Sequence, residues 1–165
     1  MSGCVIPGSF DPVTRGHVDL IRRAAQIFDR VTVVAMVNVN KAGCFAPEER
    51  VRMLEQALRG VPNARVDRWD GLLSDYMRVK GEKTVIRGAR GVAEFDAEYT
   101  AAQANRMLNP EMETLLMPAG DGLQCVSSSA VREIAAFGGD VREFVPAECA
   151  EEIIRGLSNR KEEKR

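Results

Sequence analysis

The sequence lacks several patterns that would assign a protein to a class at once. Its four cysteines, Cys4, Cys44, Cys125 and Cys149, have no CxxC spacing, so we expect reduced thiols rather than a disulfide framework or a zinc site. No apolar run approaches the roughly 20 residues that cross a bilayer. Charged and turn residues interrupt the N-terminus where a signal peptide would have its apolar segment. We therefore expect a cytoplasmic protein with no membrane partner.

The chain also lacks an excess of charge of one sign. Its 165 residues include 23 Lys and Arg and 24 Asp and Glu, for a net charge of −1. Nothing in this balance indicates a nucleic acid as a partner. There is no internal repeat and no low-complexity linker. The length suits one domain with a sizeable core, which we place at residues 1–157. The remaining residues, 158–165, form a charged C-terminal tail that we expect to fray.

Segments typical of strands and helices alternate along the sequence. Strands are expected at residues 3–7, 31–37, 64–69, 84–87 and 113–118. Apolar spacings of three and four residues and helix-start signals predict helices after Thr14, after Pro47, and at 72–80, 94–108, 128–137 and 147–157. Five strand–helix units predict an α/β fold: a single doubly wound, Rossmann-like, five-stranded parallel sheet with helices on both faces. Such sheets bind ligands beyond the carboxyl ends of their strands.

The most informative segment is PGSFDPVTRGH, residues 7–17. An apolar run precedes it and an amphipathic helix pattern follows it. Thr14 is the expected N-cap, which places His17, the only histidine, in the first helical turn. Unpaired N–H groups and the positive end of the helix dipole favour an anion at such a position. The segment therefore predicts a phosphate or nucleotide site at the end of the first strand.

Further candidate residues follow the other expected strands. Lys41 follows the second strand, Leu73 the third, the segment 87–90 (RGAR) ends the fourth, and the segment 120–129 follows the fifth. One Lys, two Arg, one His and several Ser and Gly would then share one rim, which is the chemistry of a polyanion site. The absence of a GxxxxGK[ST] loop and of GxGxxG after the first strand argues against kinases and dehydrogenases.

Each candidate also has a simpler interpretation. His17 could be a surface histidine and Lys41 an exposed loop lysine. Arg87 and Arg90 could belong to structural ion pairs, and the serines at 127–129 could do no more than cap a helix. The polyanion interpretation gains weight because one topology would bring all of these residues to the same rim.

Taken in order, the motifs resemble those of the bacterial phosphopantetheine adenylyltransferases, within the nucleotidylyltransferase superfamily. They are TRGH at 14–17, EER at 48–50, IRGAR at 86–90, Glu98, NR at 105–106, VSSS at 126–129 and VRE at 131–133. The resemblance covers roughly residues 3–157. It implies transfer of the adenylyl group of ATP to 4′-phosphopantetheine, which gives dephospho-coenzyme A and pyrophosphate. It further implies a homohexamer, and Mg²⁺ delivered with ATP rather than held in a metal site of the protein.

The resemblance also implies roles for individual residues. His17, Lys41, Arg87 and Arg90 would be the catalytic donors, with His17 stabilising charge in the transition state. Ser9, Lys41, Leu73 and Arg87 would bind 4′-phosphopantetheine. The ATP site would consist of Ser9, Phe10, His17, Gly88, Ala89, Arg90, Glu98, Leu123, Gln124, Cys125, Val126, Ser127, Ser128 and Ser129. Three positions, Ala46, Ala97 and Cys125, depart from the residues we expect in this family.

Two other functions stay open on the residues alone. One is a nucleotidylyltransferase that acts on nicotinamide mononucleotide or a phosphoalcohol, although IRGAR and the serine-rich helix start argue against it. The other is a nucleotide sensor that binds ATP without releasing pyrophosphate. Pyrophosphate release measured with each acceptor, and with none, would separate the three.

Overall fold

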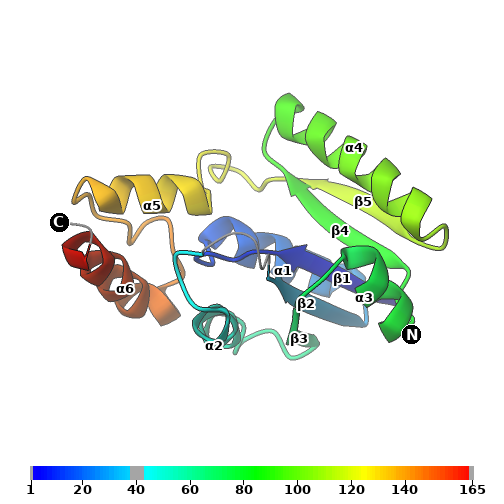
Figure 1. The fold of residues 1–165 in the computed structure, drawn as a ribbon, viewed down its shortest axis with the longest axis horizontal. Coiled ribbons are helices and arrows are strands. Elements are labelled where there is room, and N and C mark those ends of the chain that lie inside the picture. The colour runs from blue at the N-terminus through cyan, green and yellow to red at the C-terminus, as the bar shows by residue number, and fades with distance from the viewer. Residues whose placement is uncertain (1, 38–42, 164–165) are drawn as a thin grey trace.

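A five-stranded parallel sheet forms the centre of the molecule (Figure 1). The computed structural model describes residues 2–37 and 43–163. The strands are β1 (Gly3–Gly8), β2 (Arg30–Met36), β3 (Ala64–Trp69), β4 (Thr84–Ala89) and β5 (Glu113–Pro118). Their order across the sheet is β3-β2-β1-β4-β5, and every neighbouring pair is parallel. The predicted α/β fold class is confirmed.

Helices connect the strands, as the alternation in the sequence predicts. They are α1 (Arg15–Ile27), α2 (Pro47–Ala57), α3 (Leu73–Lys80), α4 (Val92–Leu108), α5 (Ser128–Ala136), the short 3-10 helix η1 (Ala147–Cys149) and α6 (Ala150–Glu163). The helix α6 continues past the predicted boundary at residue 157 and through most of the segment that we expected to fray. Residues 158–163 contain Arg, Lys and Glu, which favour helix, and no Gly or Pro to stop it.

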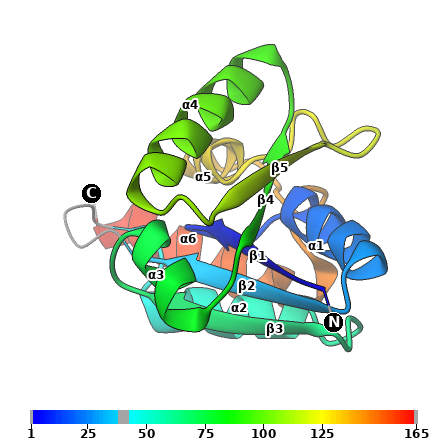
Figure 2. The ribbon, with the colours of Figure 1, turned by 90° about the vertical axis from the view of Figure 1, so that its right-hand side faces the viewer.

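The two faces of the sheet are buried by different helices. On β1, Cys4 and Ile6 face a core that also contains Ile21 of α1 and Met53 of α2. The intervening residue, Val5, faces a smaller core that includes residues of α3. Figure 2 shows α3 and α4 on one side of the sheet and α1 on the other. This alternation along a strand explains why β1 is an uninterrupted apolar run, since both of its faces are covered.

The order of the strands places a switch point beside β1. The chain runs from β1 outward through β2 to β3, then crosses to β4 on the other side of β1 and continues to β5. Connections after β1 and β4 therefore leave in opposite directions and open a crevice at the carboxyl ends of these strands. The turn after β1 and the residues at the end of β4 meet at this crevice.

The helix α4 is the least buried helix of the fold. It packs on β4, β5 and α3, yet none of its residues is buried. Its exposed apolar side chains include Val92, Phe95, Tyr99 and Met107. Several exposed apolar side chains on one helix are typical of an interaction site.

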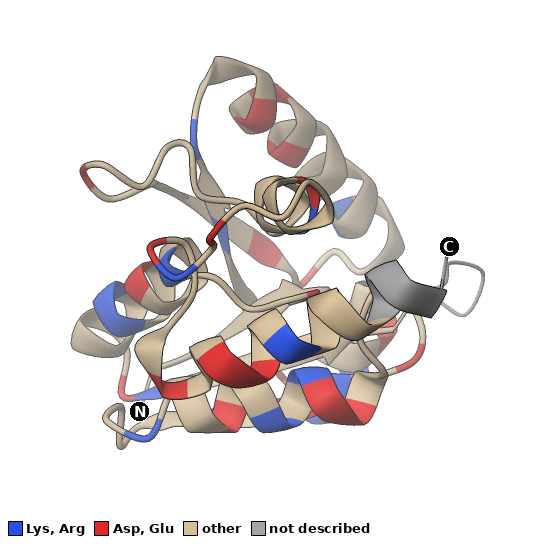
Figure 3. Cartoon of the chain, turned by 90° about the vertical axis from the view of Figure 1, so that its left-hand side faces the viewer, with Lys and Arg blue, Asp and Glu red and all other residues tan. Residues whose placement is uncertain are grey.

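The surface charge is mixed in sign. Figure 3 shows basic and acidic residues interspersed over the helices on the side it presents. Within the described part of the chain, no helix combines the length and the apolar character needed to cross a membrane.

Candidate active site

A cleft with two lobes lies at the carboxyl ends of β1 and β4. The larger lobe has a volume of about 430 Å³ and the smaller one of about 310 Å³. Five residues line both lobes and form the waist between them: Pro7, Gly8, Ser9, Arg87 and Glu98. Two ligands bound in separate lobes would therefore meet beside Arg87.

Most of the predicted site residues line this cleft. The larger lobe contains Ser9, Phe10, His17, Arg87, Gly88, Ala89, Arg90, Glu98, Leu123, Val126, Ser127, Ser128 and Ser129. Leu73 lines the smaller lobe together with Ser9 and Arg87. Lys41 lies outside the described residues. Ala97, one of the unexpected residues, lines the larger lobe.

Gln124 and Cys125 are the two predicted nucleotide-binding residues that do not line either lobe. Both are exposed to solvent. They follow a turn in which Gly122 has a φ of +75°, and the chain enters the cleft only at Val126. The sequence spacing places the whole segment near the site, but it does not reveal which turn residues point away.

The start of α1 fixes the position of His17. Thr14 is the N-cap, as predicted: its hydroxyl accepts a hydrogen bond from the backbone N–H of His17 at 3.4 Å. In return, His17 Nδ1 accepts from the backbone N–H of Thr14 at 3.0 Å. The backbone group can only donate, so Nδ1 is an acceptor and the neutral ring carries its proton on Nε2. The ring of Phe10 packs edge-on against the imidazole at 4.9 Å between centroids.

The imidazole is held in its neutral form. Burial lowers the pKa of His17 to about 4, and the nearby positive charges of Arg87 and Arg90 contribute to the same shift. At neutral pH the ring therefore supplies a neutral Nε2–H donor at the cleft.

Side chains from two helices hold the turn after β1. They donate to three of its carbonyl oxygens, which directs these oxygens toward protein donors. A bound polyanion would otherwise be repelled by unpaired carbonyl oxygens. The three hydrogen bonds run from Arg50 of α2 to Ser9 O, from Arg132 of α5 to Asp11 O and from Ser128 of α5 to Pro12 O.

The carboxylate of Asp11 anchors the segment that precedes α2. It accepts hydrogen bonds from the backbone N–H groups of Cys44 at 2.6 Å and Phe45 at 2.7 Å. Asp11 is buried, so these two donors replace the water that its charge has lost. The turn that carries Ser9 and the chain just before α2 are thereby held together.

Arg87 is paired with a carboxylate of α4. Its Nε and Nη2 donate to the two oxygens of Glu98 at 2.8 and 2.6 Å, and its Nη1 donates to the carbonyl of Pro7. The simpler interpretation of Arg87 as a member of an ion pair is thus confirmed. The pair also lies at the waist, where both lobes reach the guanidinium.

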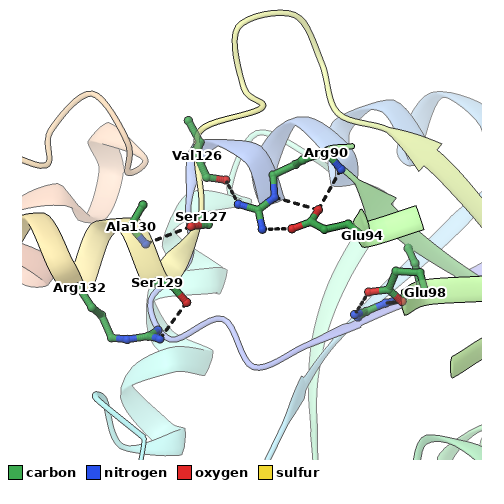
Figure 4. A network of polar contacts seen from close by, with 9 residues as sticks. Arg90, Glu94, Glu98, Val126, Ser127, Ser129, Ala130 and Arg132 are labelled. Atoms are coloured by element: carbon green, nitrogen blue, oxygen red, sulfur yellow. Dashed lines mark hydrogen bonds and ion pairs between the residues drawn. The ribbon is translucent and has the colours of Figure 1, made fainter. Parts of the chain in front are cut away.

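A second pair, Arg90 and Glu94, lies at the larger lobe (Figure 4). Arg90 donates through Nε and Nη2 to Glu94, and its Nη1 donates to the carbonyl of Val126 at 3.3 Å. This last bond links the end of β4 to the start of α5, where Ser127 caps the helix by accepting from Ala130 N at 3.0 Å.

The sequence motifs imply no role for Glu94 or Arg132, although both line the larger lobe. The i,i+4 spacing of Arg90 and Glu94 could have revealed the first. Arg132 is one turn beyond the serines and donates to Ser129 Oγ at 3.2 Å. Among the arginines of this lobe that the structure describes, it is the one without a carboxylate partner.

The fold and the site together define a class of nucleotide-handling proteins. A model of the cytidylyltransferase-like family matches residues 5–134. The chain is also similar in fold to a bifunctional NMN adenylyltransferase/ADP ribose pyrophosphatase from Francisella tularensis, with a TM-score of 0.74 and 14% identity over 99% of this chain and 54% of that one.

Relatives with higher sequence identity identify the family within this class. The phosphopantetheine adenylyltransferase of Clostridium tetani is 40% identical over 97% of this chain and 100% of its own length. Those of Heliobacterium modesticaldum and Alkaliphilus metalliredigens are 44% and 45% identical, over 88% and 94% of this chain and 87% and 97% of their own. The chain belongs to the phosphopantetheine adenylyltransferase family, which confirms the resemblance found in its motifs.

Proposed function

We propose that this protein transfers the adenylyl group of ATP to 4′-phosphopantetheine and releases dephospho-coenzyme A and pyrophosphate. Its family membership supports the reaction. The single structural observation that carries it is the two-lobed cleft, whose lobes join at Ser9 and Arg87. A reaction that links two phosphate-bearing substrates requires such a meeting point between them.

The two lobes suit the two substrates. The larger lobe has the helix start that bears His17, the backbone of Gly88 and Ala89, and the serines that begin α5. Backbone N–H groups and hydroxyls of this kind bind phosphates, so we assign this lobe to ATP. The smaller lobe is lined largely by apolar groups, among them Met36 and Leu73, which suits the pantetheine arm.

The chemistry requires positioning and charge stabilisation rather than a base. The nucleophile is a phosphate oxygen, already anionic at neutral pH. It forms a bond to the α-phosphorus while the bond from that phosphorus to the pyrophosphate oxygen breaks, so no proton has to be removed. The Nε2–H of His17 would donate to the α-phosphate as its charge grows. Arg87 and Lys41 would hold the phosphate of phosphopantetheine, and Arg90 and Arg132 the triphosphate.

We propose that Mg²⁺ is bound mainly by the phosphates of ATP. The carboxylates that line the larger lobe, Asp19, Glu94 and Glu98, are each paired with an arginine. Within the described ranges, no group of three or more His, Cys, Asp or Glu side chains is arranged to hold a metal. When bound, the ion would neutralise part of the triphosphate charge.

We further propose a homohexamer that works in the cytoplasm. The exposed apolar side chains of α4 support association between copies, since Val92 and Met107 are 88% and 86% exposed in the single chain. The number six rests on the family resemblance. Light scattering at micromolar concentration would test it, and a mass near 18.2 kDa would contradict the assembly without affecting the proposed chemistry.

Mass spectrometry of the reaction products tests the proposed activity. The protein is incubated with ATP, Mg²⁺ and either 4′-phosphopantetheine, nicotinamide mononucleotide or no acceptor. We expect dephospho-coenzyme A and pyrophosphate in the first arm alone. A folded, ATP-binding preparation that makes no dephospho-coenzyme A would contradict the proposal, and a product from nicotinamide mononucleotide would indicate the alternative transferase.

A further inference from the structure

We propose that Glu94 is a positioning residue for adenylyl transfer, which it serves by orienting Arg90 in the nucleotide lobe. This inference rests on the function proposed above. Glu94 stands in the first turn of α4, four residues after Arg90. It contacts no other charged side chain of the lobe as closely, and the motifs in the sequence assign it no role.

The contacts of Glu94 fix Arg90 on two sides. One carboxylate oxygen accepts from both the backbone N–H of Arg90, at 2.9 Å, and its Nε, at 3.0 Å. The other oxygen accepts from Nη2. With Nη1 bonded to Val126 O, the plane of the guanidinium is held between α4 and the start of α5 (Figure 4).

This arrangement leaves Arg90 able to bind an anion. A guanidinium has five N–H groups, and the contacts to Glu94 and Val126 use three of them. One N–H remains on each Nη, at a residue that lines the lobe. The Arg90 side chain is 35% exposed, and its hydrogen bonds to Glu94 and Val126 restrain the guanidinium. A restrained donor loses less conformational entropy when it binds an anion than a free donor does, and this favours the binding of ATP.

A double-mutant cycle tests this role. Glu94→Gln keeps the length of the side chain and an oxygen that can accept from the Arg90 backbone N–H, but it loses the bidentate pairing. We expect kcat/KM for ATP to fall about tenfold, within the range of coupling measured between contacting residues. KM for phosphopantetheine should not change, because Glu94 lines only the larger lobe.

The cycle is completed with Arg90→Ala and the double variant. If Glu94 acts through the Arg90 side chain, E94Q should have no further effect in the R90A background. The same tenfold loss in that background would overturn the proposal, because Glu94 would then act through the backbone of α4. Tighter binding of ATP by E94Q would also overturn it, since Glu94 would then be a competing anion.

Asp75→Asn is the matched control. Asp75 pairs with Arg78 on α3 at 2.8 Å and lines neither lobe, so its loss should leave both substrates unaffected. Calorimetry with ATP alone provides a readout that needs no product. A wild-type protein that binds ATP but forms no dephospho-coenzyme A would contradict the proposed function. If the wild type is active and the losses caused by E94Q and R90A add up in the double variant, only the role of Glu94 would be contradicted.

Discussion

The neutral His17 donor leads to a prediction that can be worked out in detail. Burial and the charges of Arg87 and Arg90 lower the pKa of His17 to about 4, so the ring is neutral at pH 7. The hydrogen bond from the Thr14 backbone to Nδ1 leaves Nε2–H as the donor. His17→Ala removes that donor, and loss of one preorganised donor to a developing charge costs about 10²–10³ in rate, or roughly 2.7–4 kcal/mol.

The matched control for this variant is His17→Asn. An asparagine oxygen can take the place of Nδ1 and accept from Thr14, so it keeps the cap but has no donor at the position of Nε2. We expect H17N to be nearly as slow as H17A in steady-state turnover while it unfolds at the temperature of the wild type. Both variants should bind ATP with little loss in calorimetry.

The pH profile of the wild-type enzyme provides a second test of the neutral His17 donor. The pKa of His17 is lowered, so its neutral form persists from about pH 5 upward and the contribution of His17 to kcat/KM should be constant there. A mechanism that needs the imidazolium would instead lose rate as the pH rises. A fall in turnover of less than about tenfold in H17A would refute the assigned role.

Three further predictions concern binding and stability. Arg87→Ala should lower kcat/KM for phosphopantetheine, because a charge-assisted hydrogen bond contributes about 1.5–3 kcal/mol; unchanged kinetics would leave Arg87 with a structural role only. Ala46 caps α2 without a side-chain bond, so Ala46→Ser should raise the free energy of unfolding in urea by about 1 kcal/mol, and no increase would contradict the capping argument. A Cβ at Gly156 would lie 2.3 Å from the buried ring of Phe45, so Gly156→Ala should destabilise by about 1–2 kcal/mol. A Cβ added at Gly60 would have no atom within 4 Å, so the control variant Gly60→Ala should not destabilise the protein.

The sequence was sufficient to predict the fold class and that most of the candidate residues lie together at the carboxyl ends of β1 and β4. The alternation of segments predicted β3 and β5 at their observed bounds, and the Thr14 cap followed from local residue preferences alone. These features depend on short-range chemistry, which the sequence displays directly. Leu73 and Leu123 also line the cleft, as the sequence predicted.

Long-range pairing was the part that the sequence could not reveal. Glu98 is 11 residues from Arg87, and their contact depends on how α4 packs on β4, so the sequence left the ion pair as one of two interpretations. The support of the turn by Arg50 and Arg132 depends on helices that are distant in sequence from residues 9–12. The full extent of α6 was missed because a run of charged residues suits a solvated helix as well as a frayed end.

The capping box at the start of α1 has a consequence for how the site is built. In its common form a glutamate or glutamine occupies the third position of such a cap, where this chain has His17. A glutamate there would complete the capping box but add a negative charge to the lining of the larger lobe, which we propose binds ATP. The imidazole is rigid: its Nδ1 accepts from the backbone N–H of Thr14, while the Nε2–H lies on the opposite edge of the ring. A single uncharged residue therefore completes the capping box of α1 and still carries the N–H donor that the proposed reaction requires.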